Sequence, residues 1–330
     1  MNLRGKRILF IAPKLFGIPE NIIQSLQSFG ALIDYYDERP ANSFIVKALI
    51  RINRNLIGAY INKYHSSIIT KTEHTQYNYI FFIKGESFSE HNLQILINKH
   101  PEAKSIVYHW DSIANNRNAL NLLKKFDYKF SFDRFDCEKF EMSFLPLFYY
   151  DHYSDISSDK TNFKYDIMFV GTAHSDRYRI IKQISSQVRR MNKQCYIYFF
   201  FQGRLMFYKY VLQNKESRDI DKSNVHFDSL SFQELFQLYE RSKTIVDVHH
   251  PRQSGLTLRC METLGARRKL VTTNNDIINY DFYNPNNILI LDRLNPSIPR
   301  EFLETPYHEI PIEIYKKYSL SSWIQSIFSH

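Results

Sequence analysis

A chain of 330 residues is longer than one hydrophobic core usually serves, so its length predicts two domains of roughly 150 residues each. Hydrophobic residues make up 44% of the chain and aromatic residues 15%, which excludes a disordered or low-complexity protein. The net charge of +9 favours polyanionic partners such as nucleic acid, an anionic membrane or a phosphorylated substrate, but the basic residues are spread along the chain and do not select among them.

The cysteines and the N-terminal segment indicate a soluble, cytoplasmic protein. Cys137, Cys195 and Cys260 are widely spaced and odd in number, so we expect neither a disulfide framework nor a metal site. Basic residues precede an apolar run at 7–12, but this run ends at Pro13 and is too short for a signal peptide. No segment approaches the ~20 apolar residues that span a bilayer. Any membrane contact would be peripheral, at the inner face of the cytoplasmic membrane.

Strand-like and helical segments alternate through the first half of the chain. Strands are predicted at 7–12, 31–36, 79–83, 105–108 and 128–132. Helical periodicity lies between them, at 20–29, 44–64, 89–99 and 118–125. This alternation predicts a domain over residues 1–150 with a parallel sheet covered by helices on both faces.

The same pattern restarts after a polar segment at 151–163, which we interpret as a linker. Strands are predicted at 165–170, 194–201, 244–248, 270–273 and 288–291, and helices at 176–187 and 231–241. These elements predict a second α/β domain over 164–310, and residues 311–330 predict a C-terminal amphipathic helix. Ligands in such sheets bind at the carboxyl ends of the strands.

The densest group of candidate binding residues follows the strand at 244–248. His249 and His250 are neighbours and point to opposite sides, so one of them is expected to contact a sugar or phosphate. Thr257 is the expected N-cap of the helix that follows. The loop residues that would approach a ligand are Arg252, Ser254, Gly255 and Leu256.

Arg259 and Glu262 share one face of that helix because they are three residues apart. A helix N-terminus offers N–H groups to phosphate, an arginine offers a cation, and a glutamate accepts from ribose hydroxyls. Together these groups match the needs of a nucleoside diphosphate. The alternative is an intrahelical salt bridge between the two side chains.

Two other strand ends in the second half carry similar groups. Gly171 and Thr172 end the strand at 165–170, with Arg177 at the start of the next helix, and Gly203 and Arg204 follow the strand at 194–201. A glycine lets the backbone approach a ligand, and the hydroxyl and guanidinium groups suit phosphate. The alternatives are simple strand-to-helix turns and exposed arginines.

In the first half, Glu86 and Asp111 follow the strands at 79–83 and 105–108. Either carboxylate could take a proton from an acceptor hydroxyl as general base, or serve instead as a helix cap or a charge partner of Lys84. The basic, amphipathic stretch at 44–64 would suit either an anionic membrane surface or the outer face of the sheet.

These segments resemble bacterial GT-B glycosyltransferases of capsule, lipopolysaccharide and exopolysaccharide biosynthesis, group-one-like and similar to the branch related to spore-maturation glycosyltransferases. The second half carries the resemblance in Tyr-Asp-Ile-Met-Phe-Val-Gly-Thr at 165–172, Ser-Gly-Leu-Thr-Leu-Arg-Cys-Met-Glu-Thr-Leu at 254–264 and Leu-Val-Thr-Thr-Asn at 270–274. The first half adds Tyr-His-Trp-Asp-Ser at 108–112 and Phe-Asp-Tyr-Lys-Phe-Ser-Phe-Asp at 126–133. The resemblance therefore covers most of the chain.

The resemblance implies an α/β protein of the GT-B fold, in which two Rossmann-like domains have parallel sheets that face each other across a cleft. The first domain would bind the acceptor, the second would bind the nucleotide-sugar, and the final helix would return toward the first. Such enzymes commonly need no divalent metal or other cofactor, because a helix end and basic side chains stabilise the leaving diphosphate. The group-one pattern has two glutamates seven residues apart, but Gly255 stands seven residues before Glu262, which mildly favours inversion with a carboxylate base.

We therefore expect a glycosyltransferase that moves a sugar from a nucleoside-diphosphate sugar to a growing, lipid-linked surface glycan. A nucleotide-sugar epimerase on the same fold and a non-catalytic glycan-binding protein are the alternatives. Nucleic acid is not an expected partner, because the chain contains no recognisable nucleic-acid-binding motif.

Overall fold

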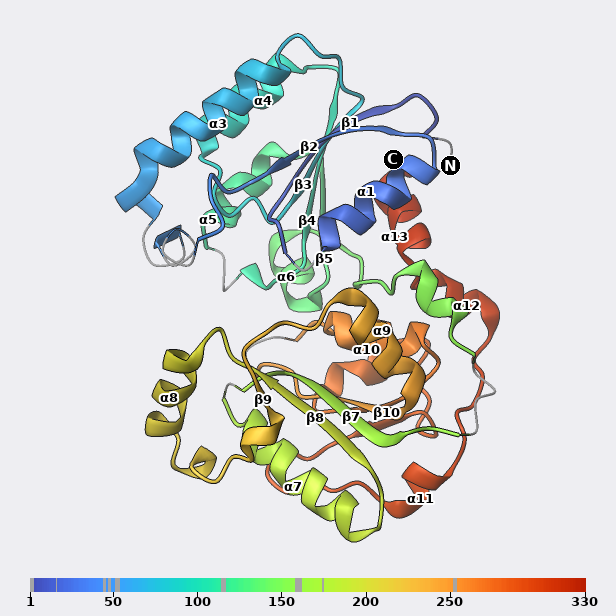
Figure 1. Cartoon of the computed structure of the whole chain (residues 1–330). Coiled ribbons are helices and arrows are strands. Elements are labelled where there is room, and N and C mark those ends of the chain that lie inside the picture. Colours follow the sequence, from blue (N-terminus) through green and yellow to red (C-terminus); the bar gives the residue numbers. More distant parts are fainter. Residues whose placement is uncertain are drawn as a thin grey trace. The chain divides into compact units, whose positions relative to one another are not determined.

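The computed structural model describes residues 3–15, 17–43, 46, 49–50, 54–113, 117–157, 162–173, 175–251 and 254–330. The chain divides into two compact units, which are coloured along the sequence in Figure 1. We call Met1–Leu147 together with Leu320–His330 unit 1, and Phe148–Ser319 unit 2.

Unit 1 is built on a six-stranded parallel sheet with the order β2-β1-β3-β4-β5-β6. Its strands are β1 (Arg7–Ala12), β2 (Leu32–Asp37), β3 (Tyr79–Ile83), β4 (Lys104–His109), β5 (Tyr128–Ser131) and β6 (Ser143–Phe144). The chain first builds outward from β1 to β2 and then continues on the other side with β3. The topological switch point, where ligands bind in open α/β sheets, therefore lies between β1 and β3.

Unit 2 has a second six-stranded parallel sheet, with the order β12-β11-β10-β7-β8-β9. Its strands are β7 (Tyr165–Thr172), β8 (Cys195–Phe200), β9 (Val225–His226), β10 (Ser242–Asp247), β11 (Lys269–Thr272) and β12 (Ile288–Ile290). Renumbered from its first strand, this sheet has the strand order of dinucleotide-binding Rossmann domains. Its switch point lies between β7 and β10.

Helices connect the strands in both units. Those of unit 1 are α1 (Ile18–Ser28), α3 (Gly58–Thr72), α4 (Glu90–Lys99), α5 (Arg117–Leu122), α6 (Arg134–Phe140) and α13 (Leu320–Ile327). Those of unit 2 are α7 (Arg177–Arg190), α8 (Arg204–Gln213), α9 (Phe232–Arg241), α10 (Leu258–Gly265), α11 (Arg300–Glu304) and α12 (Ile312–Lys317). The predicted architecture of two successive parallel α/β sheets is confirmed. Within the described ranges, none of the helices has the length and apolar character needed to cross a membrane.

The predicted helix at 44–64 is wrong in extent. Residues 44–45, 47–48 and 51–53 of this stretch lie outside the described residues, and the helix that follows, α3, starts at Gly58 and continues to Thr72. Its buried face contains Ile61, His65 and Ile68, in helical spacing. A histidine in the middle of the buried face interrupts the apolar pattern, so the helical periodicity of the sequence does not indicate this part of the helix.

The predicted single helix at 311–330 is divided into α12 and α13. The backbone N–H of Tyr149 donates to the carbonyl of Tyr318 at 2.9 Å, and Tyr149 forms a parallel bridge with Ser319. This pairing takes the backbone out of helical geometry. Beyond it, α13 lies beside α1 in unit 1 (Figure 1) and buries Trp323, whose ring centroid is 4.8 Å from that of Tyr108.

The segment expected as a linker contributes to the core of unit 2. It begins with a 3₁₀ helix at Asp151–Asp155, and Tyr153 and Ile156 are buried. Just before it, Tyr149 packs against the end of α10. A Cβ atom added at Gly265 would lie 2.6 Å from Tyr149 Cγ, so only glycine fits at this contact.

Candidate functional site

The carboxyl edge of the unit 2 sheet contains the start of α10. Thr257 is the N-cap, as predicted, because its hydroxyl accepts a hydrogen bond from the Cys260 backbone N–H at 3.3 Å. The side-chain amide of Asn274 donates to the carbonyls of Ser254, at 2.8 Å, and Gly255, at 3.3 Å. This amide holds the loop in place ahead of the helix. Leu256 is buried, so the loop is also held by a side chain in the interior of unit 2.

Arg177 lies at the switch point between β7 and β10. Its Nε donates to the carbonyl of Val248 at 2.9 Å, and its Nη1 donates to the carbonyl of Thr172 at 3.0 Å. The guanidinium therefore joins the carboxyl ends of the two strands and is not the exposed arginine of the alternative interpretation. Within the part of the chain that the structure describes, no carboxylate forms an ion pair with it. Burial lowers the pKa of Arg177, and the nearby Asp247 opposes this shift without reversing it.

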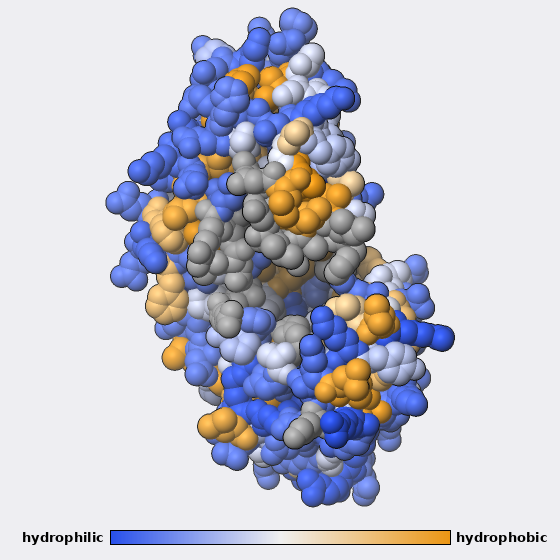
Figure 2. Space-filling model, turned by 90° about the vertical axis from the view of Figure 1, so that its left-hand side faces the viewer, coloured by the Kyte–Doolittle hydropathy of each residue, from blue (hydrophilic) through white to orange (hydrophobic). Residues whose placement is uncertain are grey.

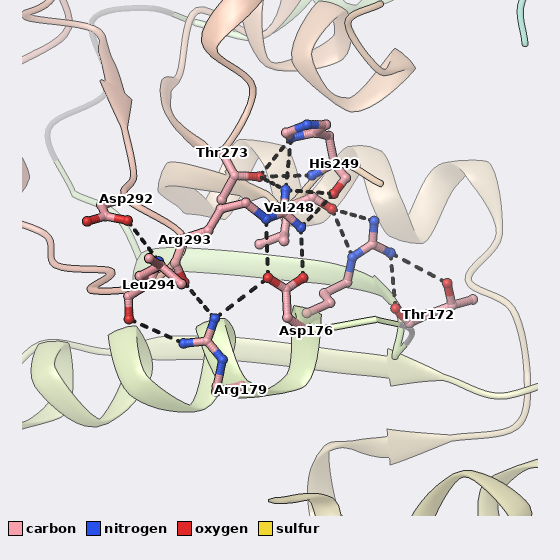
Figure 3. A network of polar contacts seen from close by, with 10 residues as sticks. Thr172, Asp176, Arg179, Val248, His249, Thr273, Asp292, Arg293 and Leu294 are labelled. Carbon is pink, nitrogen blue, oxygen red and sulfur yellow. Dashed lines mark hydrogen bonds and ion pairs between the residues drawn. The ribbon is translucent and has the colours of Figure 1, made fainter. Parts of the chain in front are cut away.

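His249 lies in a polar network with Thr273, Arg293 and Asp176 (Figure 3). Thr273 Oγ1 is 2.8 Å from His249 Nδ1. Arg293 donates to Thr273 Oγ1 at 3.2 Å and to the His249 carbonyl at 3.2 Å. The Arg293 guanidinium also donates to the Asp176 carboxylate, with Nη2 2.7 Å from Oδ1 and Nε 3.2 Å from Oδ2. The network therefore ties together the ends of β10, β11 and β12 and the start of α7.

Arg259 and Glu262 form the intrahelical contact that was the alternative interpretation, with Nη1 and Oε2 3.6 Å apart. Glu262 Oε2 also accepts from the Tyr239 hydroxyl at 3.0 Å. Arg259 in turn donates to the carbonyl of Val170 at 3.2 Å, which directs its guanidinium to the end of β7. The Glu262 side chain is 7% exposed, and this burial raises the pKa of its carboxyl group.

The carboxyl edge of the unit 1 sheet contains a buried group of charged side chains. Glu86 is fixed between Arg39, at 3.0 Å, and Lys84, at 3.6 Å. Lys84 also reaches Asp111 at 3.2 Å. The backbone N–H of Glu86 donates to Glu38 Oε2 at 3.2 Å. The two predicted base candidates are therefore joined through one lysine, but they differ in access, since the Glu86 side chain is 8% exposed and that of Asp111 is 34% exposed.

Glu38 is fully buried, and desolvation together with the nearby Glu86 raises its pKa to about 8. A proton on Glu38 at neutral pH relieves the repulsion between two buried carboxylates. The pKa of His109, at the end of β4, falls to about 3 because burial and Lys84 both disfavour its charged form.

The remaining predicted residues lie beside Arg177, at the start of α8, at the surface or outside the described residues. Gly171 lies next to Arg177, since a Cβ atom there would be 3.3 Å from Arg177 Nη1. His250 is exposed, and Arg252 lies outside the described residues. Arg204 follows Gly203 at the start of α8 and lies over the Phe227 ring, 5.9 Å from its centroid.

Four residues of these networks were not predicted from the sequence: Arg293, Thr273, Glu38 and Arg39. Each stands at or just beyond the carboxyl end of a predicted strand, which is the one signal that would have indicated them. A search for polar residues at every strand end would have included all four.

No family model matches the sequence, and the curated proteins contain no match to it. Solved structures do resemble the fold over nearly the whole chain. An α,α-trehalose 6-phosphate synthase from Burkholderia multivorans has a TM-score of 0.63 at 8% identity, covering 99% of this chain and 96% of the other. A UDP-forming α,α-trehalose-phosphate synthase from Burkholderia vietnamiensis has a TM-score of 0.60 at 8% identity, covering 98% and 99%.

Anabaena Alr3699/HepE, in complex with UDP and glucose, has a TM-score of 0.52 at 13% identity, covering 98% of this chain and 94% of the other. At such identities the likeness concerns the fold alone. It confirms the predicted fold class, because these neighbours are GT-B glycosyltransferases and the likeness extends over both units.

Proposed function

We propose that this protein is a glycosyltransferase that takes a sugar from a nucleoside-diphosphate sugar held by unit 2. The observation that carries the proposal is the placement of Arg177 at the switch point of the unit 2 sheet, near Arg259 on the first turn of α10. A half-buried arginine without an ion-pair partner among the described residues, close to a helix N-terminus, favours a bound anion. Neighbours of this fold include one in complex with UDP and glucose, which supports a diphosphate as that anion.

In this proposal different groups of unit 2 bind the diphosphate and the ribose of the nucleotide. The α10 N-terminus and its loop, from Ser254 to Thr257, would meet the diphosphate together with Arg177. Glu262 would accept a hydrogen bond from a ribose hydroxyl through the carboxylate oxygen that Tyr239 does not use. The basic groups would stabilise the charge of the leaving diphosphate, which is the role of a metal ion in other transferases. We therefore propose a metal-independent reaction.

We propose that Asp111 of unit 1 is the general base of an inverting transfer, and that Glu86 is not. Glu86 is buried and held by two cations, so its carboxylate is not accessible to an acceptor hydroxyl. Asp111 is more exposed and contacts Lys84 from one side. Deprotonation of the acceptor hydroxyl by Asp111 would form the nucleophile that displaces the diphosphate in one step.

We propose further that the acceptor is a growing, lipid-linked surface glycan and that the protein works at the cytoplasmic face of a membrane. Helix α8 supports this view, because Leu205, Tyr208 and Leu212 are 81%, 61% and 78% exposed and share one helical face. Arg204 and Lys209 are exposed on the same short helix. Apolar groups flanked by cations suit an anionic bilayer surface. Figure 2 views the side on which α8 lies in Figure 1, and hydrophobic groups stand out there among hydrophilic ones.

Cosedimentation with vesicles tests this surface. Vesicles that contain phosphatidylglycerol should retain the protein better than vesicles of phosphatidylcholine alone, and Leu212→Ser should weaken the retention. Leu294→Ser is a matched control, because Leu294 is also 78% exposed but follows β12, at the opposite edge of the unit 2 sheet from β9. Equal loss in both variants would remove α8 from the proposal.

The donor site is tested by the thermal stability of the protein with UDP, GDP, CMP, ADP or TDP, without added metal. A ligand at ~100 times its dissociation constant stabilises the folded state by about 2.7 kcal/mol. A selective shift that is lost in Glu262→Ala supports the transferase, and no shift with any nucleotide refutes the donor site. Turnover of the donor sugar without any acceptor would indicate an epimerase instead, and glycan binding without nucleotide binding would indicate a non-catalytic protein.

A further inference from the structure

If His249 carried its proton on Nδ1, the hydroxyl oxygen of Thr273 would face three hydrogen-bond donors, which is one more than it can accept. Thr273 Oγ1 already accepts from the His249 backbone N–H at 3.2 Å and from Arg293 Nη1 at 3.2 Å. Two donors fill both lone pairs of a hydroxyl oxygen. The hydroxyl proton is then left to donate, and the acceptor in reach is His249 Nδ1 at 2.8 Å.

The position of Arg293 leads to the same assignment. Its Nη1 lies 3.4 Å from His249 Nδ1, and a guanidinium nitrogen can only donate. A proton on Nδ1 would face this cation and a hydroxyl that has no acceptor capacity left. The imidazole of His249 therefore carries its proton on Nε2, a tautomer that follows from its neighbours.

We propose that Thr273 and Arg293 are positioning residues that hold His249 as a neutral imidazole with an outward Nε2–H, and that this N–H donates to an oxygen of the bound nucleotide-sugar. The ligand half of this proposal rests on the proposed function, whereas the tautomer does not. No hydrogen bond from the described residues reaches Nε2, so the donor remains available to a ligand. His249 is thus a fixed hydrogen-bond donor and not a base.

The charges around His249 agree with a neutral ring. Burial lowers the pKa of His249 to about 4, with Arg293 as the next largest cause. The other charged groups that face it are Asp247 from β10 and Arg177 and Asp176 from the start of α7, and the two carboxylates oppose the two arginines. Because Arg293 is itself held by Asp176, replacing its guanidinium group would change both the charge and the hydrogen-bond geometry at the His249 ring.

Two-bond ¹H–¹⁵N spectra of protein labelled in histidine test the tautomer, with the His249 signal assigned from its loss in His249→Gln. The wild type should show the Nε2–H form alone, and the ring should stay neutral down to about pH 5, since its pKa is about 4. Thr273→Val should mix the tautomers, because it removes the hydroxyl that donates to Nδ1. Thr244→Val is the matched control, because Thr244 is also buried in unit 2 but its hydroxyl has no hydrogen-bond partner among the described residues.

Arg293→Lys gives a second variant if Thr273→Val fails to fold, and it should also mix the tautomers. An Nδ1–H signal in the wild type, or an unchanged tautomer in both folded variants, would overturn the positioning role. UDP should shift the His249 signal, and Thr273→Val should weaken UDP binding about fivefold, the loss of roughly one neutral hydrogen bond.

The UDP titration separates this proposal from the proposed function. If UDP moves other resonances but leaves His249 unchanged, the ligand contact is wrong and the donor site stands. If neither UDP nor any other nucleoside diphosphate changes the spectrum, the donor site fails and the ligand contact with it, while the tautomer is still read from the protein alone.

Discussion

Glu262→Gln tests the ribose contact most directly, because glutamine keeps the shape of the side chain and removes its charge. In the wild type, Oε2 is already shared by the Tyr239 hydroxyl at 3.0 Å and Arg259 at 3.6 Å. One oxygen is left for the ligand, so a single charge-assisted bond is at stake. Such a bond contributes about 1.5–3 kcal/mol. We expect a value at the lower end, because Arg259 already offsets part of the charge of the Glu262 carboxylate. We therefore expect UDP to bind about tenfold more weakly.

The assay is isothermal calorimetry with UDP and with 2′,3′-dideoxy-UDP, which lacks the ribose hydroxyls. Wild-type protein should prefer UDP by about tenfold, and Glu262→Gln should bind the two nucleotides almost equally. Tyr239→Phe is the control, because it removes the partner of Oε2 and leaves the other oxygen in place. If Glu262→Gln kept the full preference for UDP, Glu262 would only support Arg259 and the ribose assignment would be wrong.

Three other predictions test the remaining inferences. Asp111→Asn should lower the transfer rate by about 10²–10⁴-fold, and a rate equal to that of the wild type would exclude Asp111 as the base. Glu86→Gln should chiefly lower the urea midpoint of unfolding, because it leaves Arg39 and Lys84 without the anion that they share. The folded protein keeps the Glu38 proton up to about pH 8, whereas an unfolded glutamic acid releases it near pH 4.5, so wild-type stability should fall between these values by up to about 1.4 kcal/mol per pH unit. Urea unfolding of Glu38→Gln should lack this slope, and an identical slope would refute the buried proton. Gly265→Ala should cost about 1–3 kcal/mol, because its methyl group would lie 2.6 Å from the Tyr149 ring packed against it. Gly58→Ala should cost nothing, because none of the described neighbours lies within 4 Å of the added methyl group. Equal unfolding midpoints for the two variants would contradict the packing.

The sequence determined the elements and their type because the signals involved are local. Apolar runs of strand length separated by helical periodicity predicted both parallel sheets, and Thr257 was identified as an N-cap from its position before a helix. Polar residues at strand ends indicated the carboxyl edges as binding sites. The helix at 58–72 was misplaced because the buried His65 breaks its apolar face, a choice that only tertiary packing explains.

The tertiary structure decided which polar residues meet and in what state. Arg293 and Asp176 are 117 positions apart, and no local pattern pairs them, because side chains in parallel sheets meet across crossovers of variable length. Glu86 and Asp111 look equivalent in the sequence, yet burial between two cations separates the first from the second. Charge and proton position depend on every neighbour within a few ångströms, and those neighbours come from distant strands, so the chemistry of each site was fixed only when the sheets were assembled.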